Sequence, residues 1–225
     1  DGVNDAPALE AATIGVAMGQ RGTDVAREAA ELVLLDDSFS TIVTAVREGR
    51  RIFDDIRKFI RYTMTSNSGE IWVLLLAPML GMPLPLLPLH IIWINLVTDG
   101  LPGLALSAEP AEKYVMQRRP RPPKERLFAQ GMAAHILSVG LLIGGLTLAT
   151  QAWAWNSGLD EWQTMVFTVL VVAQLVHSRA IRSERYSLWS IGVFSNPALV
   201  IAIAVTVLAQ MAVIYLPFFN TVFQT

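Results

Sequence analysis

The sequence contains no cysteine among its 225 residues. This absence excludes a disulfide framework, cysteine-based metal sites and cysteine redox chemistry. Basic residues are also missing from long parts of the chain, because all 17 lysines and arginines fall into three blocks and none follows Arg185. The net charge of −2 therefore says little about partners, and we expect no nucleic-acid partner.

Long apolar stretches lie between and after the basic blocks, and 53% of all residues are apolar. Crossing a bilayer takes about 20 mostly apolar residues, so we expect a mainly α, polytopic transmembrane bundle of about five spans. The spans are predicted at residues 60–80, 88–106, 130–154, 163–180 and 197–216. The lipid bilayer is then a partner, and no obligate protein partner is inferred.

The basic blocks alternate with the predicted spans. The connections without lysine or arginine are residues 81–87, 156–161 and 220–225. The segments that carry lysine and arginine are assigned to the cytoplasm by the positive-inside bias. The cytoplasmic segments are then residues 1–60, 107–129 and 181–196. We expect this arrangement to lie in the plasma membrane.

Residues 1–48 are typical of the end of a soluble α/β domain. A short apolar run, Thr13–Met18, predicts a buried strand, and Gly22–Asp24 offers a cap for a helix over Val25–Ala30. Glu31–Leu35 predicts a second strand. Two strands and one helix cannot bury a core, so we expect the rest of the domain upstream and take the chain as a fragment.

Residues 49–225 are expected to form the membrane domain, entered by one long helix over residues 40–80. At 1.5 Å per residue this helix is about 60 Å long, roughly twice the hydrocarbon thickness. Such a helix could carry motion from a cytoplasmic domain to a site in the membrane.

Two carboxylates, Glu70 and Asp99, fall inside consecutive predicted spans. An ionisable residue in a span costs about 2.5–3.5 kcal/mol even on the more permissive insertion scale, so each is a functional-site candidate. Helical spacing places Asn67 on the face of Glu70, and Asn95 and Thr98 on the face of Asp99.

The candidate site offers oxygen ligands. Pro102 cannot donate a backbone hydrogen bond, and its ring crowds the carbonyl of Thr98. This carbonyl is therefore predicted to be free beside Asp99. Ca²⁺ takes about 6–8 oxygens in flexible geometry, so this set nearly completes a calcium site. The alternative is a pair of acids satisfied by hydrogen bonds or by a basic partner.

Several motifs together resemble the P-type cation-transporting ATPases, in the same order along the whole chain. The motifs are DGVNDAPAL at residues 1–9, IGVAMG at 14–19, DDSFS at 36–40, SNSGE at 66–70 and WINLVTDGLP at 93–102. The last two resemble the calcium-pump branch. The resemblance implies that residues 1–48 end a HAD-like phosphorylation domain carrying the family's hinge motif.

The resemblance also implies roles for residues near the start of the chain. Asp1 would coordinate the catalytic Mg²⁺, and Asn4 and Asp5 would hold the phosphate and magnesium geometry while phosphoryl passes from ATP to an aspartate. The phosphorylated Asp-Lys-Thr-Gly motif and the nucleotide domain are absent from this sequence. We therefore expect this fragment alone to be inactive.

One position departs from the calcium pumps that bind two ions. Their equivalent of the span at 163–180 supplies an acidic ligand, whereas this sequence has Gln174. We therefore favour one Ca²⁺ per cycle, bound by Glu70 and Asp99 with neutral oxygens. The alternatives are a pump for Mn²⁺ or a monovalent cation, and a truncated, non-catalytic membrane bundle.

Overall fold

The computed structural model describes residues 2–112, 114–122, 128, 131–183 and 186–225. It divides into two compact units. The first comprises residues 1–51 and 111–118, and the second comprises residues 52–110 and 119–225. Each unit has its own fold.

The first unit contains a parallel pair of strands joined by a helix. Strand β1 (Val16–Met18) pairs with β2 (Leu32–Leu34), and α2 (Asp24–Ala29) connects them. The hydroxyl of Thr23 caps α2 by accepting a hydrogen bond from the Ala26 amide at 3.3 Å. The predicted order of strand, capped helix and strand is confirmed.

Residues 111–118 belong to the first unit, although the sequence placed them with the membrane domain. The guanidinium of Arg50 donates hydrogen bonds to the carbonyls of Val115 and Arg118, each at 2.9 Å. A short helix, η3 (Val115–Gln117), lies in this segment. These long-range bonds, which no local pattern reveals, explain the difference.

A single helix, α3 (Phe39–Met79), covers the long helix predicted over residues 40–80. Just before it, Asp36 accepts hydrogen bonds from the Thr41 hydroxyl at 2.6 Å and the Ser38 amide at 3.1 Å. The bond from Thr41, together with that from Ser38, holds the pKa of Asp36 below its usual value. A charged Asp36 at this end also suits the helix dipole.

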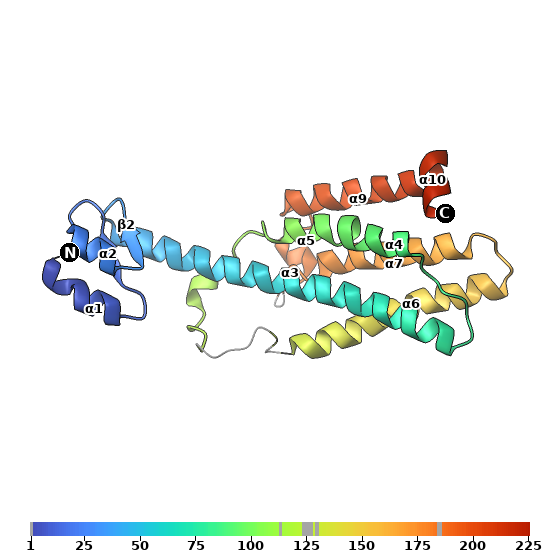
Figure 1. Ribbon diagram of the computed structural model, residues 1–225, viewed down its shortest axis with the longest axis horizontal. Coiled ribbons are helices and arrows are strands. Elements are labelled where there is room, and N and C mark those ends of the chain that lie inside the picture. Colours follow the sequence, from blue (N-terminus) through green and yellow to red (C-terminus); the bar gives the residue numbers. More distant parts are fainter. Residues whose placement is uncertain (1, 113, 123–127, 129–130, 184–185) are drawn as a thin grey trace. The chain divides into compact units, whose positions relative to one another are not determined.

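The second unit is a bundle of helices (Figure 1). Its elements after α3 are α4 (Pro88–Trp93), η2 (Ile94–Thr98), α5 (Gly100–Leu106), α6 (Met132–Asn156), α7 (Trp162–Ala180), α8 (Leu188–Ile191), α9 (Pro197–Tyr215) and α10 (Pro217–Phe223). In this bundle α5 packs against α7 and α9, and α6 packs against α7. A mainly α bundle is what the composition predicted.

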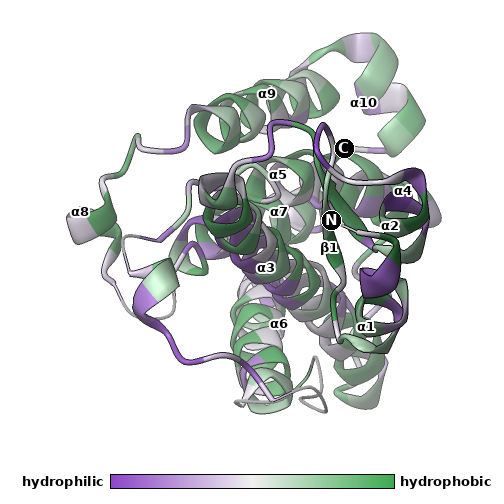
Figure 2. Ribbon diagram, turned by 90° about the vertical axis from the view of Figure 1, so that its left-hand side faces the viewer, coloured by the Kyte–Doolittle hydropathy of each residue, from purple (hydrophilic) through white to green (hydrophobic). Residues whose placement is uncertain are grey.

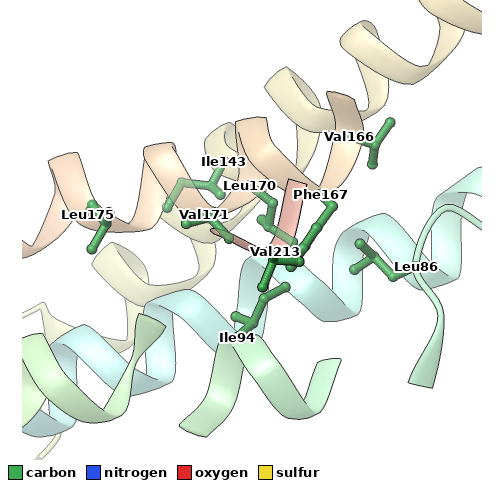
Figure 3. Packing of buried hydrophobic residues seen from close by; sticks show 9 residues of the cluster. All are labelled: Leu86, Ile94, Ile143, Val166, Phe167, Leu170, Val171, Leu175 and Val213. Atoms are coloured by element: carbon green, nitrogen blue, oxygen red, sulfur yellow. The ribbon is translucent and has the colours of Figure 1, made fainter. Parts of the chain in front are cut away.

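The largest apolar cluster of the bundle joins α7 to its neighbours (Figure 3). Its members come from α6, α7, α9, the η2 segment and the connection before α4, and they are Leu86, Ile94, Ile143, Val166, Phe167, Leu170, Val171, Leu175 and Val213. Five of these nine lie on α7, so this helix is the centre of the core.

Three segments of the described chain are long and apolar enough to cross a membrane: Pro88–Leu106, Met132–Asn156 and Pro197–Tyr215. They agree with the spans predicted at 88–106, 130–154 and 197–216, and they make the protein a multi-pass membrane protein. On α9, exposed apolar side chains such as Ile201 and Leu208 suit contact with lipid, and Figure 2 shows this helix as mainly hydrophobic. The structure is also helical at 60–79 and 163–180, and that these two segments cross the membrane stays a prediction.

Helix α6 approaches the backbone of α3 closely at two glycines. A Cβ on Gly144 would lie 2.8 Å from the Cβ of Trp72 and 3.2 Å from the carbonyl oxygen of Gly69. A Cβ on Gly140 would collide with Ser68. Small residues at this spacing let two membrane helices pack closely.

We predict that Gly144→Ala destabilises the protein, because the added methyl group meets backbone and Cβ atoms that cannot move independently. The expected loss in the free energy of unfolding is about 1–3 kcal/mol, measured by denaturation in detergent. Gly145→Ala is the matched control, since nothing lies within 4 Å of a Cβ at Gly145. Equal effects at the two positions would contradict the close contact.

Candidate functional site

The two predicted acids are buried in the second unit. Glu70 on α3 is 4% exposed, and Asp99, between η2 and α5, is 3% exposed. The Asp99 carboxylate lies close enough to Glu70 for the two groups to repel each other. No lysine or arginine of the described residues forms an ion pair with either acid.

Two amides from different helices hold Glu70. The Nδ2 of Asn95, on η2, donates to its Oε2 at 3.2 Å, and the Nε2 of Gln174, on α7, donates to its Oε1 at 3.2 Å. Gln174 is fully buried. The structure thus brings three predicted site residues from three helices into direct contact.

Asp99 has no such partners. Both of its carboxylate oxygens are buried, and neither forms a hydrogen bond of normal geometry with a described residue, although the hydroxyls of Tyr62 and Ser66 lie close to this carboxylate. The hydroxyl oxygens of Thr98 and Ser66 and the Oε1 of Gln174 are likewise buried without a hydrogen-bond partner in the described parts of the chain. Unsatisfied buried polar atoms are costly, so a cluster of them needs an explanation.

The backbone before Asp99 is irregular. Residues 94–98 form a π-helix, η2, closed by a bond from the Asp99 amide to the Ile94 carbonyl at 2.8 Å. The sequence predicted a break from Pro102, which leaves the Thr98 carbonyl without its usual backbone donor. Single π turns inside helices occur frequently at functional sites.

The Thr98 carbonyl is not free, which corrects the sequence-based expectation. It accepts a hydrogen bond from the hydroxyl of Tyr62 on α3 at 2.9 Å. Tyr62 is fully buried. The sequence reasoning missed Tyr62 and Ser66, although both share a helix face with Glu70 at spacings of eight and four residues.

Asn67 is half-buried on α3, one turn before Glu70, while Asn95 is exposed. Within the described residues, no group of three or more histidine, cysteine, aspartate or glutamate side chains could hold a metal ion. A cation here would therefore be bound by the two carboxylates together with neutral oxygens. That donor set is the kind that hard cations take.

The predicted phosphate-site residues lie in the first unit. Asp1 lies outside the described residues, and Asn4 and Asp5 are exposed on the short helix η1 (Val3–Asp5), which leads into α1 (Ala6–Ala11). The Asp5 carboxylate accepts a hydrogen bond from the Gly2 amide at 2.8 Å. Exposed carboxylate and amide oxygens on a turn suit Mg²⁺, which keeps several waters when bound.

We predict that Tyr62→Phe lowers the free energy of unfolding by about 1–3 kcal/mol, because the Thr98 carbonyl then lacks a partner in a buried place. Chemical denaturation in detergent measures the change. Tyr215→Phe is the control, since Tyr215 is 72% exposed and should change stability by less than about 0.5 kcal/mol. Equal losses would contradict the role of the Tyr62 hydroxyl.

Comparisons with known proteins show the family of the chain. A family described as "Cation transporting ATPase, C-terminus" matches residues 83–225. The calcium-transporting ATPase of Bacillus subtilis is 48% identical to this chain. The alignment covers all of this chain and 26% of the Bacillus protein.

More distant relatives extend over the same region. The probable cation-transporting ATPase F of Mycobacterium tuberculosis is 42% identical, and the calcium-transporting ATPase type 2C member 1 of Pongo abelii is 37% identical. Each alignment covers all of this chain and 25% of the relative. The chain thus spans about a quarter of the length of these relatives, and it belongs to the cation-transporting ATPase family, of which it covers the C-terminal part.

Proposed function

We propose that the chain is the C-terminal part of an ATP-driven P-type pump and that Glu70 and Asp99 bind the transported cation. One observation carries this proposal: the Asp99 carboxylate is buried beside Glu70, and neither of its oxygens forms a hydrogen bond of normal geometry or an ion pair with a described residue. A buried carboxylate without a partner is unfavourable by several kcal/mol. A bound cation would offset that cost for both acids.

Ca²⁺ is the cation that the donor set favours. Carboxylates, amides and hydroxyls are hard oxygen ligands, and two negative charges balance one divalent ion. The relatives in Bacillus subtilis and Pongo abelii are named calcium-transporting ATPases, whereas the mycobacterial relative is named only a cation-transporting one. Mn²⁺ and monovalent cations therefore remain the alternatives to be tested.

Two side-chain amides next to Glu70 could serve as ligands. Asn95 and Gln174 now present N–H groups to Glu70. Rotation of each side-chain amide by half a turn would swap the positions of its nitrogen and its oxygen. The oxygen could then bind a cation. Gln174 has no charge to add, so we propose one Ca²⁺ per cycle, bound by Glu70, Asp99 and the neutral oxygens of Asn67, Asn95, Thr98 and Gln174.

The remaining ligands are proposed to come from elsewhere in the same polypeptide. Asn95 is exposed although it contacts the buried Glu70, so the site can be approached from this side of α4 and η2. An exposed polar residue in a membrane span is unfavourable in contact with lipid. Upstream segments of the pump would cover it.

The energy for transport would come from ATP through residues of the first unit. Asp1, Asn4 and Asp5 are proposed to hold Mg²⁺ beside the phosphate. When bound, Mg²⁺ neutralises charge on the transferred phosphoryl group. The uninterrupted helix α3, which also carries Glu70, would couple the two events. The connections that carry lysine and arginine all lie on one predicted side of the membrane, and residues 1–60 belong to that side. Positive-inside bias therefore supports a cytoplasmic location for the first unit.

We predict that Asp99→Asn in the full-length protein abolishes ion-stimulated phosphorylation from ATP, because the site loses a carboxylate that no basic residue of the described structure neutralises. Phosphoenzyme formation across a range of Ca²⁺ concentrations measures the effect. Asp160→Asn is the matched control, since Asp160 is exposed on the connection between α6 and α7. Unchanged phosphorylation in Asp99→Asn would refute the assignment of the site.

The same assay separates the competing functions when Mn²⁺, Na⁺ and Mg²⁺ replace Ca²⁺. Stimulation by Mn²⁺ or Na⁺ but not by Ca²⁺ would change the cargo while keeping the site. Absence of any phosphoenzyme in the full-length protein would instead support a non-catalytic membrane bundle.

We predict that Asp1→Asn slows phosphoryl transfer at least about 100-fold, because electrostatic stabilisation of the transferred group is lost, while ion binding persists. The measurements are rapid-quench phosphorylation and equilibrium binding of radioactive Ca²⁺. Loss of ion binding with normal phosphoryl transfer would reverse the proposed division of roles.

A further inference from the structure

A second buried charge cluster lies in the membrane unit, away from the candidate ion site. Arg182 and Glu109 are 2% and 3% exposed. The Nη2 of Arg182 donates to the Oε1 of Glu109 at 2.7 Å, and its Nε donates to both carboxylate oxygens at 3.0 and 3.1 Å. Such forked contacts fix the direction of both side chains, not only their separation.

The remaining donors of Arg182 bind the connection that leads to α9. Its Nη1 donates to the Gly192 carbonyl at 3.0 Å, and its Nη2 donates to the hydroxyl of Ser195 at 2.6 Å. Gly192 has a φ of +93°, a conformation that a residue with a side chain rarely adopts. This conformation directs the backbone after α8 so that the Gly192 carbonyl binds the Arg182 guanidinium.

Asn196 extends the cluster to α5. Its Nδ2 donates to Glu109 Oε2 at 2.7 Å and to the Ala105 carbonyl in the last turn of α5 at 3.1 Å. Its Oδ1 accepts from the Leu199 amide at 2.9 Å and so caps α9. One side chain thereby joins the end of α5, the start of α9 and the ion pair.

Helix α5 is consequently held at both ends. The Tyr62 hydroxyl binds the Thr98 carbonyl just before Asp99, and the cluster of Glu109, Arg182 and Asn196 binds the other end. Apolar side chains cover the same junction, where Ala105 and Leu106 pack with Tyr62, Ile181 and Leu199. Asp99 lies between these two anchors, one residue before α5 begins.

We propose that Arg182 is a positioning residue for the ion site, which it serves by fixing, through Glu109 and Asn196, the place of α5 and hence of Asp99. The inference rests on the proposed function of Asp99. A metal site needs its ligands within about 0.5 Å of their productive places. A loosened α5 therefore weakens ion binding while leaving the phosphorylation chemistry intact.

The test compares two phosphorylation reactions of the full-length protein. Phosphorylation from ATP requires the transported ion, whereas phosphorylation from inorganic phosphate is measured without it. In Arg182→Gln, we expect the ion concentration for half-maximal phosphorylation from ATP to rise at least about tenfold. Phosphorylation from inorganic phosphate should stay at the wild-type level.

Two further variants control the experiment. Arg179→Gln changes an arginine whose hydrogen bond within the described part of the chain goes to the Val193 carbonyl in the same connection, and it should leave the ion dependence unchanged. Asn196→Ser keeps an N-cap residue for α9 but is too short to reach Glu109 and Ala105. Asn196→Ser should raise the half-maximal ion concentration several-fold. It therefore tests the proposal even if Arg182→Gln fails to fold.

Three outcomes would overturn the proposal. They are wild-type ion dependence in Asn196→Ser and in any folded Arg182→Gln, an equal loss of both phosphorylation reactions in Asn196→Ser, and an equal shift in Arg179→Gln. Failure of the proposed function itself gives a different result, because the wild-type protein would then show no ion-dependent phosphorylation at all.

Discussion

Two carboxylates buried in one apolar bundle, with no basic partner among the described residues, are the constraint on which the rest of the membrane unit depends. Glu70 is stabilised by amide donors from η2 and α7, which ties three helices together at one point. Asp99 forms no hydrogen bond of normal geometry with a described residue. The protein therefore tolerates a locally unfavourable centre, and the surrounding helices have to be held by interactions made elsewhere.

Those interactions lie around the centre rather than in it. The apolar cluster of α7 joins α6, η2 and α9, and the glycines of α6 allow direct backbone contact with α3. The buried ion pair of Glu109 and Arg182 secures the end of α5. These contacts enclose the candidate site directly, because Gly144 meets the backbone of Gly69 beside Glu70 and Ile94 of the apolar cluster precedes Asn95.

Much of this arrangement could be predicted from the sequence. Apolar length predicted the segments around α4–α5, α6 and α9. Helical spacing grouped Asn67 with Glu70, and Asn95 and Thr98 with Asp99, and this grouping stays a prediction. The hydrogen bond from Tyr62 to the Thr98 carbonyl could not be predicted, because it joins residues 36 positions apart on different helices. The Arg50 contacts and the cluster around Arg182 could not be predicted for the same reason, since periodicity describes only neighbours within one helix.

The π-helix before Asp99 has a mechanical consequence. A π turn holds one residue more than an α-turn, and its return to α geometry would rotate the following segment by about 100° relative to α4. Because α5 is anchored at its far end by Asn196, that rotation would fall mainly on α4 and η2, which carry Asn95. Asn95 faces Glu70 in the π-helical register that the structure shows, and a return to α geometry would turn it away.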